Sequence, residues 1–340
     1  MTRSRKSDSV WFAKAERVGE LLPRSRLHPA VLRWAESQRS PRAWCVALSG
    51  GADSLALLIV LWAHWPAARA KLTALHFNHR LRGRAATADA RFCQNVCRAL
   101  GVKCVVGVWR AAVKGASEAE SRVARHAFFA REMKRRGSRA LWLAHQQDDI
   151  AETMLMRLAR GSGTAGLAAL RPVQLVAKDR VHLRPFLTLK KQELIAALRL
   201  TGIKWREDAS NEGQDFFRNR IRHTVLPAWQ KAAGRDAQAG AALARALLEE
   251  DDTALEVWLD RLAPLKRGVL DLKVLHDVPR AVVRRALHLW MLAVRPETDL
   301  SRQGFEVLLA AITRGTATRF SLGRKGFAVI RQGKLYFRKA

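Results

Sequence analysis

The sequence is poor in acidic residues and has no long apolar run. Its 340 residues include 30 Asp and Glu against 61 Lys and Arg, a formal net charge of +31. No apolar run reaches the ~20 residues that a membrane span requires, so we expect no membrane partner. No apolar stretch follows the basic N-terminus, so we expect no secretory signal. The basic excess favours a polyanionic partner, above all nucleic acid, over a merely solvated surface.

Cysteine is scarce as well. Cys45, Cys93, Cys97 and Cys104 form no Cys-x-x-Cys pair, which argues against a zinc site or a redox pair. We expect reduced, buried thiols and a cytoplasmic protein.

The most informative stretch is a turn of small residues between two apolar segments. It consists of Ser49, Gly50, Gly51, Ala52, Asp53 and Ser54. Adjacent glycines let the backbone approach a ligand, and the start of the following helix offers N–H groups to an anion. The spacings of a Walker A loop and of a dinucleotide fingerprint are both absent. A carboxylate beside phosphate requires a cation, so Asp53 predicts Mg²⁺. The alternative is an ordinary strand-to-helix turn.

Apolar strand-like runs alternate with helical segments and predict a doubly wound parallel sheet in an α/β fold. The expected strands are 44–48, 72–77, 102–108 and 140–144, and the expected helices are 55–65, 87–100, 117–136 and 190–200. Ligands of such sheets bind at the carboxyl ends of the strands. We expect a basic helical lead-in over 1–40, a catalytic domain over 41–225 and a smaller α+β domain over 226–340. In the last, we expect helices at 229–260, 281–293 and 303–312, then small strands over 318–338.

Two further clusters follow predicted strands or helices. Asp148, Asp149 and Glu152 begin a helix after the fourth strand, where acidic residues also serve as ordinary helix caps. If this strand end lies beside the glycine turn, the carboxylates need a cation, either Mg²⁺ or a substrate amine. Three arginines in close succession, at 218, 220 and 222, fit a polyanion contact better than a core face.

The glycine turn resembles the PP-loop of the ATP-pyrophosphatase superfamily, and the ordered set of motifs resembles the tRNA(Ile)-lysidine synthetase family over residues 40–228. One departure is His126, where the family usually has Tyr. The motifs are Ser49-Gly-Gly-Ala-Asp-Ser54, Asn78-His-Arg-Leu-Arg82, Arg122 with Arg125, His145-Gln-Gln-Asp-Asp149 with Glu152, Arg157-Leu-Ala-Arg-Gly-Ser-Gly163, Arg184-Pro185, Trp205-Arg-Glu-Asp-Ala-Ser-Asn211 and Arg218-Asn-Arg-Ile-Arg222.

The resemblance implies a Rossmann-like PP-loop fold and a carbon–nitrogen ligase. ATP would adenylate the C2 oxygen of the wobble cytidine (position 34) of a CAU-anticodon tRNA(Ile), and L-lysine would then displace AMP to leave lysidine. ATP would contact residues 49–54 and His76, with Mg²⁺ on Asp53. Asp149, Glu152 and, in reserve, Asp148 would bind lysine. Asp53, Asp149, Glu152 and Arg125 would be catalytic. Arg82, Arg125, Arg218, Arg220 and Arg222 would hold phosphates, and residues 226–340 would recognise tRNA. An oligomer is possible.

Three alternatives share parts of this pattern. A PP-loop tRNA sulfurtransferase normally needs paired cysteines, which the sequence lacks. An ammonia-using amidotransferase should carry a glutaminase nucleophile, and no motif for one is visible. A non-catalytic RNA-binding protein on the same fold would have no need of Ser49, Asp53, Asp149 and Glu152.

Overall fold

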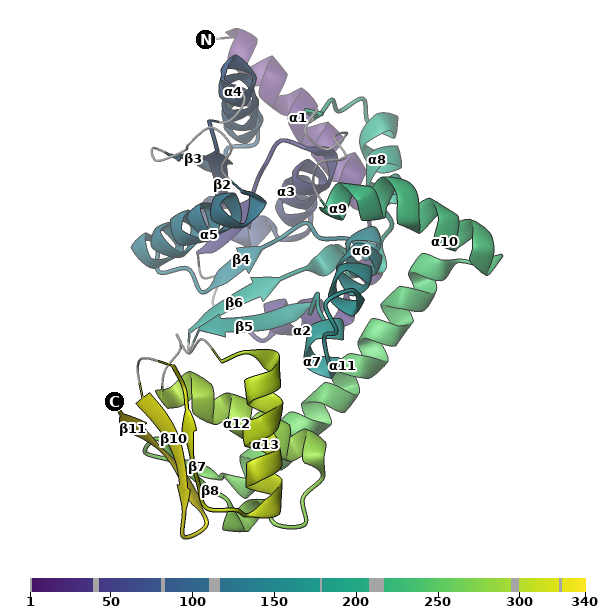
Figure 1. Ribbon diagram of the computed structural model, residues 1–340. Helices are drawn as coiled ribbons and strands as arrows, with labels where there is room; N and C mark the ends of the chain where they lie inside the picture. Colours follow the sequence, from purple (N-terminus) through teal and green to yellow (C-terminus); the bar gives the residue numbers. More distant parts are fainter. Residues whose placement is uncertain are drawn as a thin grey trace. The chain divides into compact units, whose positions relative to one another are not determined.

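A computed structural model describes residues 2–38, 43–80, 83–109, 117–177, 179–207, 217–294, 300–323 and 326–340. The chain forms two compact units, Met1–Leu247 and Leu248–Ala340 (Figure 1). The expected boundary between a catalytic domain ending at residue 225 and a tRNA-recognition domain beginning at residue 226 concerns function. It stays a prediction.

The first unit is built on a six-stranded sheet of order β3-β2-β1-β4-β6-β5. Its five strands from β3 to β6 are parallel, and the edge strand β5 runs antiparallel to β6. The strands are β1 (Trp44–Ala47), β2 (Leu72–Asn78), β3 (Lys103–Val108), β4 (Ala140–Trp142), β5 (Val173–Ala177) and β6 (Arg180–Leu183). The four expected strands are confirmed, whereas the β5–β6 hairpin was not expected.

Helices cover both faces of this sheet, because alternate residues of its strands point to opposite sides. Trp44 and Val46 pack into a core shared with α1 (Thr2–Leu21), α2 (Pro29–Glu36), α3 (Ala52–His64), α4 (Arg84–Ala99) and α8 (Lys191–Leu200). Cys45 and Leu141 face the other way, where Phe128, Phe129 and Met133 of α5 (Glu118–Arg135) cover them. The doubly wound arrangement is therefore confirmed.

The rest of the first unit is helical. These elements are α6 (Gln147–Leu158), α7 (Thr164–Leu167), α9 (Phe217–Arg220), a π-helical turn (Ile221–Val225), α10 (Leu226–Ala233) and α11 (Ala237–Leu262), whose end belongs to the second unit. The single helix expected over 229–260 is instead two helices. Gly234 ends α10 in the left-handed conformation, with φ of 60°, which glycine adopts at little cost.

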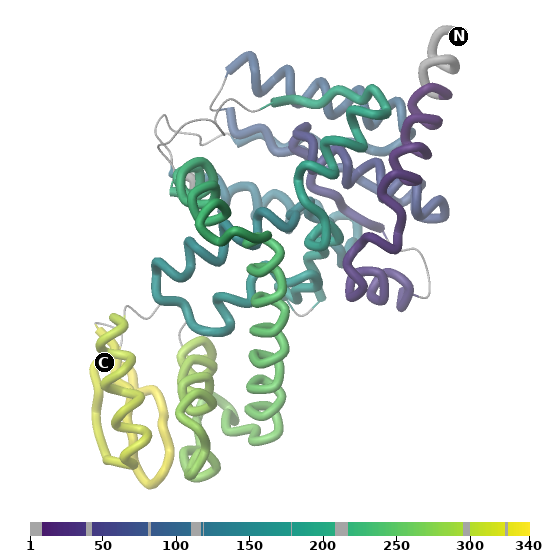
Figure 2. Tube along the Cα trace, turned by 90° about the vertical axis from the view of Figure 1, so that its right-hand side faces the viewer, coloured from purple at the N-terminus to yellow at the C-terminus, as the bar shows by residue number. Residues whose placement is uncertain are grey.

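The second unit packs the end of α11 and two further helices against an antiparallel sheet of order β7-β8-β11-β10-β9. Its elements are α12 (Arg280–Val294), α13 (Arg302–Arg314), β7 (Leu265–Lys266), β8 (Val269–Asp271), β9 (Thr318–Ser321), β10 (Gly326–Arg331) and β11 (Lys334–Lys339). Figure 2 shows β10 and β11 side by side at the yellow end of the chain. The expected α+β character and the terminal small strands are confirmed.

Candidate active site

The candidate site lies where β1 and β4 end. These strands are parallel neighbours, with Trp44 opposite Ala140, so the segments that follow them emerge at the same edge of the sheet. The segment after β1 is the glycine turn that leads into α3, and the segment after β4 leads into α6, which carries Asp149 and Glu152. The topology therefore brings the expected phosphate turn and the acidic cluster together.

The glycine turn is closed by its own two serines. The Ser54 hydroxyl accepts hydrogen bonds from the backbone N–H groups of Ser49 (3.1 Å) and Gly50 (3.3 Å) and donates one to the Gly51 carbonyl (3.0 Å). The Ser49 hydroxyl accepts the Gly51 N–H at 3.3 Å. Gly51 caps α3 without a side-chain hydrogen bond, so the first turn of α3 offers backbone donors to an anion.

Gly50 has a φ of +97°, and a Cβ built on it would lie 3.3 Å from the Cys93 sulfur. Such a φ strains any residue with a side chain. We therefore expect Gly50→Ala to raise the KM for ATP about ten-fold, because the strained turn loses its donor geometry. The control is Gly240→Ala, at a helical position with nothing within 4 Å of the added Cβ. Equal ATP dependence of both variants in steady-state assays would contradict the role of this turn.

Asp53 is a buried carboxyl group whose surroundings disfavour its ionised form. Its Oδ1 atom is buried and has no hydrogen-bond partner among the described residues. Burial, reinforced by the nearby Asp149 and Asp148 carboxylates, raises the pKa of Asp53 to about 7, against the opposing charges of Lys191 and Arg222. A carboxylate oxygen of this kind fits a divalent cation, which restores the missing partner and favours the ionised form. Asp53 would hold Mg²⁺ here.

Asp149 and Glu152 form a buried acidic pair that two arginines neutralise. The Arg218 guanidinium bridges them, bonding Asp149 and, through Nε at 2.7 Å, Glu152. Arg222 makes two bonds to Glu152, of 2.6 and 2.9 Å. Burial works the other way, but these bonds raise the pKa of Arg222. Because the Glu152 side chain is 1% exposed while both arginines are 25% exposed, the guanidiniums lie on the accessible side of the pair.

A second, strongly basic cluster adjoins this pair. Arg184 is buried and donates to His145 Nδ1 at 3.2 Å and to the Arg171 carbonyl at 2.7 Å. Burial and the nearby Arg122 lower the pKa of Arg184 to about 10. Burial, Arg184 and neighbouring arginines, Arg125 among them, depress the pKa of His145 far below its usual value. The cluster thus holds His145 neutral and concentrates positive charge near Asp149.

A family model of the PP-loop domain matches residues 25–229, which include the turn and both clusters. The chain belongs to the PP-loop family. Curated relatives, each named tRNA(Ile)-lysidine synthase, come from Symbiobacterium thermophilum (40% identity; 62% of this chain, 44% of the relative), Geobacter sulfurreducens (38%; 77% and 56%) and Pseudomonas aeruginosa (36%; 75% and 57%). The resemblance to this family is confirmed, and the chain spans about half the length of these relatives.

Among solved structures, the U34-tRNA thiolase NcsA from Methanococcus maripaludis, with its [4Fe-4S] cluster, has a TM-score of 0.52. The two chains are 17% identical, and the match covers 70% of this chain and 78% of that one. At this identity the likeness concerns the fold alone. It agrees with the PP-loop architecture of the first unit.

The remaining predicted residues of this PP-loop protein lie at varied distances from the turn. His76 is buried, and its Nδ1 forms a hydrogen bond of 2.9 Å with the carbonyl of Leu48, the residue directly before the turn. Asp148 accepts the Lys191 backbone N–H at 3.0 Å and a bond from Gln238 at 3.2 Å. Arg220 is exposed on α9. Arg82 and residues 208–211 lie outside the described residues. The roles of these residues stay predictions.

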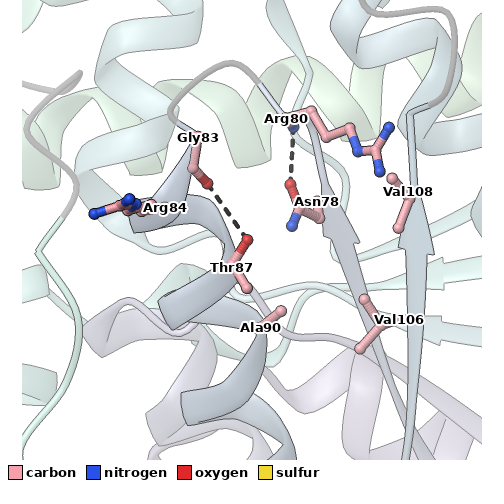
Figure 3. A pocket seen from close by; sticks show the side chains of 8 residues that line it. All are labelled: Asn78, Arg80, Gly83, Arg84, Thr87, Ala90, Val106 and Val108. Carbon is pink, nitrogen blue, oxygen red and sulfur yellow. Dashed lines mark hydrogen bonds between the residues drawn. The ribbon is translucent and has the colours of Figure 1, made fainter.

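A shallow depression of about 620 Å³ lies beside this region, between β2, β3 and the start of α4 (Figure 3). Asn78 accepts the Arg80 N–H at 2.8 Å there, and Arg80 and Arg84 also line it. None of the turn residues 49–54 lines it.

Sequence reasoning did not single out Lys191, whose charge acts on Asp53. It is the first residue of α8, and no motif marks it. Arg184 stood in a quoted motif but was given no role. The dipeptide Arg-Pro is too common in protein sequences to indicate a buried guanidinium.

Proposed function

We propose that this PP-loop protein makes lysidine in tRNA(Ile) with a CAU anticodon. It uses ATP to adenylate the C2 oxygen of the wobble cytidine, which releases pyrophosphate. The ε-amine of L-lysine then attacks C2, and AMP leaves with the C2 oxygen. The observation that supports this is the pairing, at one sheet edge, of the phosphate turn with the acidic pair Asp149 and Glu152.

In the first step, the turn amides and the start of α3 hold the phosphates of ATP. Asp53 would hold Mg²⁺, and the ion would supply positive charge to balance that of the departing pyrophosphate. The cytidine must leave its stack in the anticodon loop to reach the site, as RNA-modifying enzymes generally require. Arg125, with the basic cluster around His145, would attract its phosphates.

In the second step, the substrate L-lysine would take the place of Arg218 and Arg222 beside the acidic pair. The ε-amine must lose a proton before it attacks, because its ordinary pKa is about 10.4. Asp149 and Glu152 would bind the α-ammonium and accept the ε-proton. Arg218 and Arg222 occupy these carboxylates with their side chains partly exposed, so they would turn to the phosphate of the adenylate as lysine enters.

The second unit, with the rest of 226–340, would grip the tRNA body through its basic side chains, and the protein would act in the cytoplasm, as a monomer or an oligomer. Among the helices of the described residues, none has the length and apolarity to cross a membrane. The sulfurtransferase alternative gains no support, since the sequence lacks paired cysteines.

The test is mass analysis of a CAU-anticodon tRNA(Ile) after incubation with protein, ATP and lysine. We expect a mass gain equal to lysine minus water, with AMP released in equal amount. A methionine tRNA with the same anticodon is the control. AMP release without a change in tRNA mass, or tRNA binding without nucleotide turnover, would contradict the proposal.

A further inference from the structure

A second segment lies across the glycine turn. After α8 the chain passes over Gly50, and the Arg206 N–H donates to the Gly50 carbonyl at 2.9 Å. A Cβ built on Gly50 would lie 3.6 Å from Arg206 Cγ, and one built on Gly51 would lie 3.9 Å from the Arg206 carbonyl. Both the backbone and the side chain of Arg206 therefore contact the turn.

The side chain of Arg206 fastens this segment to the body of the fold. Its Nε donates to Asp89 Oδ1 at 2.7 Å. Asp89 is a buried residue of α4, and its side chain is 8% exposed against 44% for Arg206. The helix α4 in turn packs on β2 and β3. The turn is thus tied, through one residue, to a helix anchored on the sheet.

This tie fixes the orientation of the peptide that joins Gly50 and Gly51. In a trans peptide the C=O and the N–H point in opposite directions. Because the Gly50 carbonyl points at Arg206, the Gly51 N–H points away from it and toward the Ser49 hydroxyl, 3.3 Å away. A glycine at φ of +97° has little steric hindrance to a flip of this peptide, and a flip would turn a carbonyl oxygen toward phosphate.

We propose that Arg206 is a positioning residue for ATP, which holds the Gly50 carbonyl by a hydrogen bond so that this carbonyl oxygen does not face the phosphates. The inference rests on the proposed nucleotide site and adds a residue outside the turn itself. Arg206 touches neither the acidic pair nor the basic cluster in any contact described above, so its loss should affect ATP more than lysine or tRNA.

The experiment measures AMP release by the full chain with ATP varied at saturating tRNA and lysine. We expect Arg206→Ala and Asp89→Asn to raise the KM for ATP about ten-fold, the effect of losing one charged hydrogen bond. Arg206→Lys, which keeps the charge but not the planar fork, should recover part of this loss. The KM for lysine and the Kd for tRNA should stay within about two-fold in all three.

The matched control is Arg199→Ala. Arg199 is an exposed residue of α8 whose guanidinium lies 5.9 Å from the ring centre of Trp205, next to Arg206 in the chain. It should leave the KM for ATP unchanged. An unchanged KM in Arg206→Ala would overturn the proposal, as would an equal loss of tRNA affinity, which would make Arg206 an RNA contact.

Two further measurements keep the result interpretable. If Arg206→Ala lowers the melting temperature, the KM values for ATP of Arg206→Lys and Asp89→Asn test the proposal instead. Each is compared with wild type at an equal folded fraction. If the wild-type protein releases no AMP, the proposed function fails. Titration with a fluorescent ATP analogue then still tests whether Arg206 positions the turn for ATP. Equal affinity of wild type and Arg206→Ala in that titration would overturn it.

Discussion

Asp53→Asn is expected to abolish AMP release, by at least about a hundred-fold in kcat, while tRNA binding stays nearly intact. The buried Oδ1 of Asp53 has no protein partner among the described residues, as expected of an oxygen that would bind Mg²⁺. An amide binds Mg²⁺ far more weakly than a carboxylate does. The measurement is AMP release with tRNA and lysine, beside tRNA binding at two salt concentrations. Asp260→Asn, at an exposed position on α11, controls for the change in net charge.

The pH dependence of wild type gives an independent check on the same carboxyl. With a pKa of about 7, Asp53 is protonated below that pH, and the proton competes with Mg²⁺. The Mg²⁺ concentration needed for half-maximal activity should therefore rise as the pH falls from about 8 to about 6. The residual activity of Asp53→Asn should lack this dependence, and a wild-type turnover in the variant would remove Asp53 from the metal site.

Stability separates loss of function from loss of fold. The folded pKa of Asp53 lies above the ordinary value of 3.8, so the native state binds this proton more tightly than the unfolded state. The ionised form therefore destabilises the metal-free fold increasingly as the pH rises from about 4 to about 7. Asp53→Asn removes that cost, and its melting temperature at pH 8 with chelator should equal or exceed that of wild type.

Glu152→Gln is expected to lower kcat/KM for lysine about a hundred-fold or more, with a smaller effect on adenylation of the tRNA. The side chain of Glu152 is 1% exposed, and it balances Arg218 and Arg222. A neutral amide leaves these two guanidiniums in excess, which repels the ammonium of lysine, and it cannot accept the ε-proton. The measurement is steady-state lysine dependence beside single-turnover pyrophosphate release with tRNA. Asp149→Ala should follow the same pattern.

The matched control is Glu132→Gln. Glu132 is also a buried carboxylate, 3% exposed and bonded to Arg136 at 2.5 Å, but it lies on a different helix, near the carboxyl end of α5, among Arg131, Arg135 and Arg136. Both variants break a buried ion pair and should lose similar stability. Only Glu152→Gln should lose lysine dependence. A defect in tRNA affinity alone would take Glu152 out of the lysine pocket.

The central strands and the helices around them could be predicted because their apolar runs are continuous. Residues 55–62 of α3 are all apolar and buried, a pattern that only a core element shows. The β5–β6 hairpin escaped prediction since it lies at the sheet edge: Leu175 is 70% exposed, and Gln174, Arg180 and His182 interrupt its apolar residues. The break at Gly234 was visible as a glycine, but its left-handed conformation is set by how the chain turns between α10 and α11.

The site was predictable where the strand order of a doubly wound sheet could be anticipated, because such a sheet makes β1 and β4 neighbours although β2 and β3 separate them in the chain. Asp53 and Asp149 follow strands that proved to be neighbours, so parallel-sheet topology sufficed to expect them together. The ion pairs of Arg218 and Arg222 with Glu152, and that of Arg206 with Asp89, join residues 66 to 117 positions apart. No local pattern encodes such pairs, because they depend on where the segment after α8, α9 and the π-helical turn after α9 fold back.

The antiparallel edge strand has a consequence for how the protein can be altered. Val173 pairs with Leu183 at the edge of the sheet that carries the candidate site, whereas Ala177 pairs with Arg180 at the opposite end. The chain therefore leaves the edge with the candidate site along β5, turns at the opposite end of the sheet and comes back to that edge along β6. A reporter peptide inserted at that far end is expected to lengthen the chain without shifting Arg184, so it is a suitable position for labelling the protein.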